Sequence, residues 1–550
     1  MSLFGSLYVG ASGLQTGQHA LNTVAHNLSN ADTVGYTRQQ TLLNDRQYNT
    51  LSVNPKGVAN QQIGLGVTYA DVRQVRDVFL DQTYRRESGR SAFYEVSYNT
   101  LTEIETLLGE LEGESFSHSL NNLWEAVQEL AKQPASSVTQ GLLIQRSSQF
   151  VEQATNVYGA LCNYQDNLNV QLKGEVDKIN TFADRLYKLN NDIIRIEAGG
   201  IERANDLRDE RNKILDELGK LGNIDYTEDQ EGGLMVKFEG HVLVNRAMTF
   251  KIEMDTDPET GFYTPFWLTD AKKILQEDGT YKYLIDNCKV YDMSRVISTA
   301  ANTDIGSLKG MMLARGTHRA DYTDLHDAKQ YNDEVASSVL MNVMAEFDNL
   351  IHNIVSEMNQ MLEDAAVKEG GTYLRNEDGT IIQLFERIGC DEYDAAGNLV
   401  REDTSPGQEN TLLTISNLVV NPALVKEPTK LGFIKMDAKE DYEIAQNLQL
   451  VFETAEYRLN PNVATKTNLI DYYSNLVSQV ANTGSVFYSI YSNEQATVDS
   501  TEYARQQIVG VSDDEELNNM IKFQNAYNAS SRYINVIDEM LEHILNTLGA

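Results

Sequence analysis

The sequence predicts a mainly α-helical chain with β-rich insertions: paired N- and C-terminal coiled-coil helices, a long helical-bundle domain, and one or two mixed α/β or β outer domains. Three observations support this fold class. Both ends of the chain carry heptad patterns, the flanking segments place apolar residues at a 3.6-residue period, and the middle alternates as strands do. At 550 residues the chain exceeds the size of a single hydrophobic core, so several domains are expected.

The first helix is predicted over residues 3–28, because apolar or small residues recur there at alternating intervals of four and three. The stripe consists of Leu3, Leu7, Gly10, Leu14, Gly17, Leu21, Val24 and Leu28. This spacing is typical of a coiled-coil seam. The two glycines each cost roughly 1 kcal/mol of helix stability relative to Ala, but they let another backbone approach closely.

A matching stripe ends the chain. It consists of Met520, Phe523, Tyr527, Ser530, Ile534, Ile537, Leu541, Ile544 and Leu548, with only Ser530 outside the apolar pattern. The leucines, isoleucines, Val24, Met520, Phe523 and Tyr527 of the two stripes are the candidate assembly interface. Chain termini are usually disordered unless something holds them, and a two-helix hairpin alone is marginally stable. We therefore expect both ends to be disordered in the monomer and to fold when copies of the chain stack.

The segment between this helix and the next part of the chain is rich in turn-forming residues. The helix is predicted to end near Ser29 and Asn30, and Gly35 allows a positive φ in the turn that follows. Residues 36–43 then begin an extended segment. Residues 1–40 and 512–550 are thereby predicted to form a terminal axial domain, joined to the rest of the chain by an abrupt turn.

Helical periodicity dominates the next layer, predicted as residues 41–220 together with 425–511. It begins with a hairpin or extended arm near residues 41–75, where Pro, Gly and Asn separate short β-branched runs. A long helical span follows over residues 138–220, with an apolar stripe between Leu168 and Ile196 and an interruption near residues 198–200.

The middle of the chain changes character. Residues 221–300 are predicted as a β-rich insertion, and residues 301–424 as a mixed α/β insertion with a helix over about 320–364. Segments 276–284 and 376–384 each place Asp-Gly between apolar flanks, which favours a β-hairpin.

No catalytic or metal site is predicted, and no cofactor. Gly10, Ser12 and Gly13 lack the glycine that a nucleophile elbow needs two residues after the serine. Gly64 and Gly66 lack the third glycine of a dinucleotide loop, and segment 255–261 is better interpreted as a surface turn than as a calcium loop. His19 and His26 share a helical face without a third ligand, and Cys162, Cys288 and Cys390 are too far apart in sequence to indicate a disulfide framework or a thiolate site.

Charge and hydropathy exclude other classes. A net charge of −35 makes the chain a poor ligand for nucleic acid or an anionic membrane. It has no 18-residue apolar run and no cleavable secretory signal at its start. Taken alone, these features indicate a cytoplasmic protein.

The turn-rich segment resembles the N-terminal signature of bacterial flagellar axial proteins, which form the rod, hook and junctions. The matching residues are Asn22, Asn27, Leu28, Asn30, Thr33, Gly35, Tyr36 and Arg38. Residues 510–549 are similar to the C-terminal counterpart, through Leu517, Phe523, Gln524, Tyr527 and Ser531. Segment 205–221 resembles the helical region of one junction member in particular. Val34 departs from the family, which usually has Pro there, and so does the pattern around Asp514.

The resemblance implies a structural protein, not an enzyme, at the junction between hook and filament. It also implies export without a cleaved signal, unfolded through the flagellar apparatus, to an extracellular position. Its implied partners are the hook protein, a second hook-associated junction protein, an export chaperone on the C-terminal helix, and further copies of the chain in a ring.

Two alternatives remain. A hook or distal rod protein would share the terminal signatures, but the long helical span at 138–220 argues against a β-rich hook body. A secreted enzyme or adhesin carried on an axial scaffold would be favoured by a cleft with converging polar groups in residues 225–424.

Overall fold

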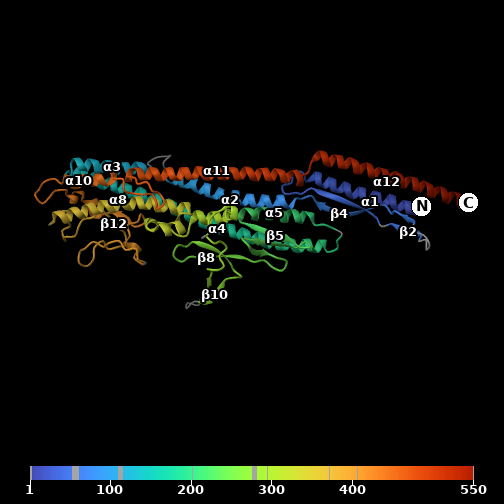
Figure 1. Ribbon diagram of the computed structural model, residues 1–550, viewed down its shortest axis with the longest axis horizontal. Helices are drawn as coiled ribbons and strands as arrows, with labels where there is room; N and C mark the ends of the chain where they lie inside the picture. The colour runs from blue at the N-terminus through green and yellow to red at the C-terminus, as the bar shows by residue number, and fades with distance from the viewer. Residues whose placement is uncertain are drawn as a thin grey trace.

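The computed structural model describes residues 3–46, 48–52, 61–109, 115–200, 202–275, 281–293, 295–370, 372–405 and 407–548. The molecule is elongated, with long helices running along it, and both chain ends lie at the same end of the molecule (Figure 1). None of the described helices combines the length and the apolar character that spanning a membrane requires.

Helices make up most of the described structure. They are α1 (Leu3–Ser29), α2 (Val78–Leu107), α3 (Phe116–Lys132), α4 (Ser137–Glu197), α5 (Asn205–Leu221), α6 (Ser307–Arg315), α7 (Ala328–Gln330), α8 (Val339–Glu369), α9 (Pro422–Lys426), α10 (Tyr442–Glu453), α11 (Leu469–Val509) and α12 (Asp513–Leu548). The predicted terminal helices are confirmed, as is the break near residues 198–200, which separates α4 from α5.

The strands pair in small antiparallel sheets. β1 (Gln39–Asp45) pairs with β4 (Val67–Gln74), β2 (Asn49–Ser52) with β3 (Gln61–Ile63), β8 (Ile252–Thr256) with β9 (Tyr263–Trp267), β10 (Lys272–Leu275) with β11 (Tyr281–Leu284), and β12 (Phe385–Arg387) with β13 (Leu418–Val420), while β5 (Ile224–Glu228), β6 (Leu234–Phe238) and β7 (His241–Val244) form one sheet. Of the two predicted Asp-Gly hairpins, the first has its turn, residues 276–280, outside the described residues. The second forms only a single bridge, between Arg375 and Ile381.

Two hydrophobic cores follow one another along the body, and α4 runs through both. The first lies between α3, the first half of α4, α8, α10 and the start of α11, where Phe116 packs its ring 4.9 Å from that of Phe347. The second lies between the later half of α4, α5, α6 and strands β5–β9. The predicted stripe on α4 is buried from Leu168 to Ile193, and Ile196 is exposed. A 61-residue helix therefore ties the two cores into one body.

The predicted helix over residues 320–364 is wrong in its first part. The long helix α8 begins at Val339, where the Ser338 side chain accepts a hydrogen bond from Met341 N and caps the helix. Upstream, Asp321 and Asp327 cap short turns by accepting bonds from nearby backbone N–H groups. These side chains offer the backbone local partners that compete with a continuous helix.

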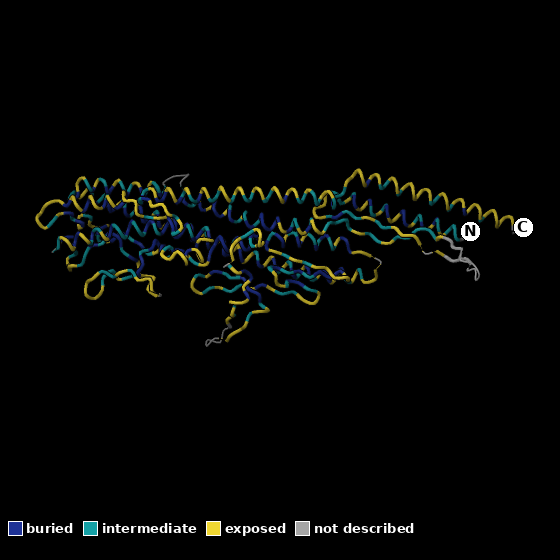
Figure 2. Tube along the Cα trace, viewed as in Figure 1, coloured by how far each residue is buried: buried dark blue, intermediate teal, exposed yellow. Residues whose placement is uncertain are grey.

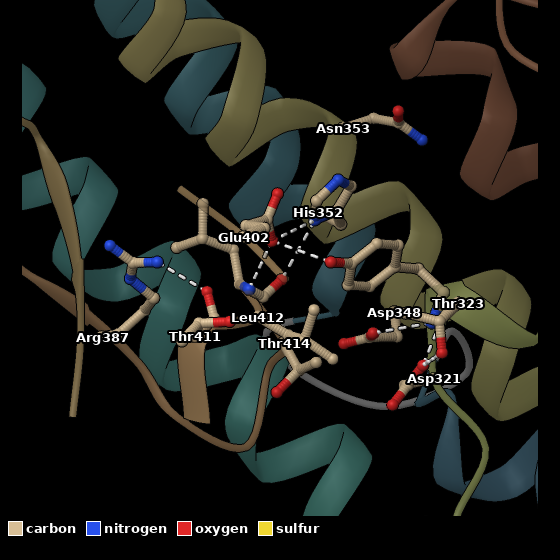
Figure 3. A network of polar contacts seen from close by, with 12 residues as sticks. Asp321, Thr323, Asp348, His352, Asn353, Arg387, Glu402, Thr411, Leu412 and Thr414 are labelled. Carbon is tan, nitrogen blue, oxygen red and sulfur yellow. Dashed lines mark hydrogen bonds and ion pairs between the residues drawn. The ribbon is translucent and has the colours of Figure 1, made fainter. Parts of the chain in front are cut away.

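Buried polar groups of α8 hold the outer segment around residues 385–415 (Figure 3). Asp348 accepts hydrogen bonds from Tyr322 N at 3.0 Å and Ile415 N at 2.8 Å, and burial raises the pKa of its carboxyl to about 7. The ring of His352 stacks 3.6 Å from that of Tyr322, whose hydroxyl donates to Glu402 at 2.8 Å. Side-chain bonds to backbone groups thus order a segment with few regular strands.

Glycines set the distance between α2, α5 and α6. A Cβ atom at Gly89 of α2 would lie 2.4 Å from Gly219 O of α5. Gly306, which precedes α6, has a φ of +97°, and a Cβ atom there would lie 2.5 Å from Gly222 Cα. Gly306 N also donates to Gly89 O at 2.8 Å. The backbones of α2, α5 and the start of α6 are therefore in direct contact.

Replacing Gly306 by Ala tests this contact. We expect Gly306→Ala to lower the free energy of unfolding of the second core by about 2–4 kcal/mol, because overpacking adds to the backbone penalty at positive φ. Urea unfolding, followed by fluorescence of the buried Trp267 in a Trp124→Phe background, measures the change.

Gly240→Ala is the matched control. Gly240 also has a positive φ, +85°, but nothing lies within 4 Å of its added Cβ. It should cost only about 1 kcal/mol. Equal losses for the two variants would contradict the packing role of Gly306.

Candidate functional site

The N- and C-terminal helices α1 and α12 pack side by side along their length (Figure 1). The contact uses the glycines of α1. A Cβ atom at Gly10 would lie 2.6 Å from Ile534 Cγ1, one at Gly13 would lie 2.5 Å from Ser530 Oγ, and one at Gly17 would lie 3.5 Å from Tyr527 Cα. Ser530, the residue outside the apolar pattern, faces Gly13 of α1. A side chain larger than serine at position 530 would therefore collide with α1.

The predicted stripe residues take different positions in this pair. On α1, Val24 is buried and Leu7, Leu14, Leu21 and Leu28 are half-buried; on α12, Ile537 is buried, Met520, Phe523, Ile534 and Leu541 are half-buried, and Tyr527 and Ile544 are exposed. The side chains of Leu3 and Leu548 lie outside the described part of the structure. The α1–α12 contact alone therefore leaves most of the stripe partly open to solvent.

A second set of apolar side chains on α12 lies outside the predicted stripe, along a helix that is largely exposed (Figure 2). Its members are Leu517, Ile521, Tyr533, Val536, Met540 and Leu545, all exposed, although Tyr533 also lies beside Gly10 of α1. One of them, Leu545, is 71% exposed. Sequence reasoning placed only Leu517 among the family residues and missed the others, because they lie outside the heptad stripe.

The opposite side of α1 packs against the β1–β4 hairpin through polar contacts. Ser12 Oγ accepts a hydrogen bond from Val67 N at 3.2 Å, and the hydroxyls of Thr23 and Thr41 are 2.9 Å apart. Ser12 is thus committed to holding the hairpin. The shaft, which we define as α1, α12 and the β1–β4 hairpin, is a three-layer element.

Asn27 organises the turn where the shaft meets the body. It is 1% exposed, and its side-chain amide bonds both backbone groups of Gln39, donating to O at 2.8 Å and accepting from N at 3.0 Å. It also accepts from Tyr36 OH at 2.8 Å and donates to Glu516 Oε2 at 3.2 Å. An amide with this many fixed partners joins α1, β1 and α12 at one point.

Arg38 links the same turn to the start of α12. Its guanidinium contacts Glu516 at 3.0 Å and Glu515 at 2.9 Å, and the Glu516 side chain is only 2% exposed. Its backbone N donates to Val509 O, the last residue of α11, at 2.8 Å. The carboxylates also sit in the first turn of α12, where the helix dipole favours negative charge.

The remaining family residues lie around this contact or on the surface. Asn30 donates to His26 O at 3.0 Å and accepts from Thr33 Oγ1 at 3.3 Å, closing the end of α1. Gly35 has a φ of +88°, as a glycine in this turn allows. Asn22 and Gln524 are exposed, and Ser531 is half-buried.

The body holds the turn through Asp209 of α5. Its carboxylate accepts from Thr37 N at 3.2 Å and from Gln74 Nε2 at 2.7 Å. Burial raises its pKa to about 6, opposed by these bonds and by Arg76. Sequence reasoning missed Thr37, Asp209 and Glu516. Only Glu516 had a sequence signal, because it belongs to the acidic run that opens α12.

An ionic cluster beside the turn fixes the end of α11 to α2 and α5. Arg505 contacts Asp216 of α5 at 2.8 Å, and Asp216 also contacts Arg85 of α2 at 2.7 Å. The Arg505 guanidinium lies 4.0 Å from the centre of the Tyr84 ring. We call the contacts of Asn27, Arg38, Asp209, Arg505 and Glu516 the joint.

The cavities of the described residues carry no evident catalytic arrangement. One of about 400 Å³ lies at the joint, between the turn at 31–37, α5 and the end of α11. A larger one, about 890 Å³, lies between strands β8–β11 and α6; its described lining has no serine, cysteine or histidine. Its buried Arg315 is tied to Asn169 Oδ1 at 2.6 Å and Tyr263 O at 2.9 Å. The described residues also contain no cluster suited to a metal ion.

Three family models match separate parts of the chain. Residues 101–372 match the flagellar hook-associated protein FlgK helical domain, residues 7–37 match the flagella basal body rod protein, and residues 506–547 match the flagellar basal body rod FlgEFG protein C-terminal region. The two shorter matches cover the shaft and its turn, and the long one covers most of the body.

Whole-chain relatives agree with these models. Flagellar hook-associated protein 1 of Bacillus subtilis is 25% identical over 551 residues, covering 100% of this chain and 99% of the relative. Its counterpart in Salmonella typhimurium is 25% identical over 97% of this chain and 98% of the relative, and that in Escherichia coli is 22% identical with the same coverage.

A solved structure has the same fold. The flagellar hook junction protein FlgK from Burkholderia pseudomallei superposes with a TM-score of 0.54 at 11% identity, covering 78% of this chain and 100% of that chain. The prediction that segment 205–221 and the two ends indicate a junction member of the axial proteins is confirmed. The chain belongs to the family of flagellar hook-associated protein 1.

Proposed function

We propose that the chain is the structural junction protein that connects hook to filament in the bacterial flagellum by axial self-assembly. The observation that carries this function is the shaft: both ends of the chain pack together, and α12 presents a set of exposed apolar side chains outside the stripe, which we call its open face. Exposed apolar surface of this kind marks a contact with another protein.

In this proposal the chain divides into the parts that its sequence predicts. Residues 1–40 and 512–550 form the axial layer, the helical body, to which α6 and α8 contribute, surrounds it, and the remaining segments of 221–424 face the medium. The terminal helices fold fully when neighbouring copies cover the apolar face of α12, since the free energy of burial then adds to that of the α1–α12 contact.

The joint suits a mechanical role. The chain passes between shaft and body where β4 leads into α2 and where α11 leads into α12. The bonds of Asp209 to Thr37 and Gln74, and of Arg38 N to Val509 O, fix the relative orientation of the two parts. Buried ion pairs with fixed geometry specify one arrangement more than they add stability. A protein between a flexible hook and a stiff filament needs such a defined connection.

The partners proposed for this role are the hook protein on one side, a second hook-associated protein on the other, further copies in a ring, and an export chaperone on α12. The proposed location is extracellular, reached unfolded without a cleaved signal. The chemistry of α12 supports the chaperone: an exposed apolar helix needs cover before assembly. No catalytic step is part of this function.

The rod-protein matches at 7–37 and 506–547 leave a hook or distal rod protein as the second candidate. The helical-domain match over 101–372 favours the junction role, because it covers the body, in which axial proteins differ.

Charging the open face of α12 tests the assembly role. Val536 is 47% exposed, so we expect Val536→Asp to leave the free energy of unfolding within about 0.5 kcal/mol of the parent. In cells lacking the native junction protein, however, it should abolish swimming, because an unpaired carboxylate would be buried between copies.

Asn535→Asp is the control, since it adds the same charge at the neighbouring exposed position. Swimming should persist with Asn535→Asp and be lost with Val536→Asp. If Val536→Asp swims as the parent does, the outer face of α12 takes no part in assembly.

A second test concerns the joint. Arg38→Gln leaves the Glu516 carboxylate buried without its cation, at a cost of about 3–5 kcal/mol. We expect flagella built with Arg38→Gln to lose filaments under shear, counted by electron microscopy, and Glu516→Gln in the same chain to restore retention in part.

Glu515→Gln is the comparison variant, because the Glu515 side chain is 61% exposed and its contact with Arg38 contributes little. We expect flagella built with Glu515→Gln to retain their filaments under shear as the parent does. Equal losses for Arg38→Gln and Glu515→Gln would mean that the buried pair does not hold the joint.

A further inference from the structure

The first half of α11 has a composition unlike the rest of the chain. Residues 472–493 form a run of 22 residues without Asp, Glu, Lys or Arg, although these types make up 23% of the sequence. The chain has one longer uncharged run, residues 1–31, which contains α1. The two runs lie in different layers, one in the shaft and one in the body.

Much of this run is on the surface. The inner side of α11 packs against α2 and buries Val480 and Val498, while the outward side is open along the edge of the body (Figure 2). Val486 is 57% exposed and Tyr488 is 52% exposed. The serines beside them at 485, 489 and 492 are exposed as well.

Aromatic rings extend this surface onto α2. Tyr98 has its ring 5.2 Å from that of Tyr488 and 6.2 Å from that of Tyr491, and the three rings lie at the groove between the two helices. We define the uncharged α11 face as Tyr98 of α2 with Ser485, Val486, Tyr488, Ser489 and Ser492 of α11.

The fold of the monomer does not account for this composition. A solvent-facing helix surface ordinarily carries charged residues, and exposed valine or tyrosine side chains contribute little to the stability of a monomer. Depletion of charge with enrichment of tyrosine is instead typical of the centre of a protein–protein interface.

Net charge indicates what covers the face. Copies of a chain with a net charge of −35 repel one another, so they approach most favourably where each presents no charge. The run is about 33 Å long and one helix is about 10 Å wide, which gives roughly 330 Å² for α11. That is about two-fifths of the ~800 Å² that one partner buries in a standard interface, so the contact on α11 would be one part of an interface that also includes the open face of α12.

The order of the helices along the chain also supports a second copy as the partner of this face. The chain passes from α11 into α12 through residues 510–512, so the uncharged α11 face and the open face of α12 belong to consecutive helices. We propose that the uncharged α11 face is the lateral contact through which the body of one subunit packs on a second copy of this chain. This inference rests on the proposed axial assembly and extends it from the shaft to the body.

A charge placed on this face tests the contact. We expect Val486→Asp to leave the circular dichroism spectrum and the melting temperature of the purified chain unchanged. In cells lacking the native junction protein, it should reduce the number of filament-bearing cells by about tenfold or more.

Val170→Asp is the matched control, because it makes the same substitution at an exposed valine of another helix, α4, where the side chain is 67% exposed. It should support filaments as the parent chain does. If the parent chain itself supports no filaments, the proposed function fails. If parent and Val486→Asp support filaments equally, only the lateral contact is overturned.

Photo-crosslinking identifies the occupant directly. A photoreactive p-benzoylphenylalanine in place of Ser489 should, in isolated hook-basal bodies with attached filaments, give an adduct of two copies of this chain, detected by mass spectrometry. The same group in place of Val170 should give none. An adduct formed only with a different flagellar protein, or no adduct at position 489, would overturn the proposal.

Discussion

The close approach of α1 and α12 is the contact that brings the two ends of the chain together and builds the shaft. Gly10 and Gly13 of α1 face Ile534 and Ser530 at distances that leave no room for a Cβ atom, and Gly17 lies in van der Waals contact with Tyr527. The two ends of a 550-residue chain are thereby held together, and the rest of the chain must leave and return at the same place. The joint is the consequence: the chain leaves the shaft between β4 and α2, and α11 leads back to α12.

The body is built to keep that connection straight. α4 passes through both cores, and α2 and α11 run together from the joint into the first core. Asp348 of α8 bonds Ile415 N and His352 contacts Leu413 O, so side chains of α8 hold the irregular outer segment directly.

The sequence predicted the parts of this structure that rest on periodicity. Heptad spacing gave the terminal helices, and 3.6-residue spacing gave α4 with its break before α5. Prediction was wrong at residues 320–338, which apolar periodicity had joined to α8 in one helix. Asp321 and Asp327 cap separate short turns there, and Ser338 caps the start of α8.

The candidate site was predictable only in part. Resemblance to a family indicated Asn27, Tyr36 and Arg38, but Glu516, the buried partner of Arg38, lies 478 residues away from it. Asp209, the partner of Thr37, lies 172 residues away from that residue. Contacts of that separation depend on the tertiary fold and leave no local pattern. The open apolar face of α12 was missed for a related reason, since a heptad pattern identifies one helix face and says nothing of a second.

The central claim is that the shaft is completed by neighbouring copies of the chain. Hydrogen exchange of the α1 and α12 amides, compared between the purified monomer and isolated flagella, tests it most directly. The claim predicts fast exchange in the monomer and strong protection in flagella, with α4 protected in both. Equal protection of α1, α12 and α4 in the monomer would contradict it, because the shaft would then need no neighbour to fold.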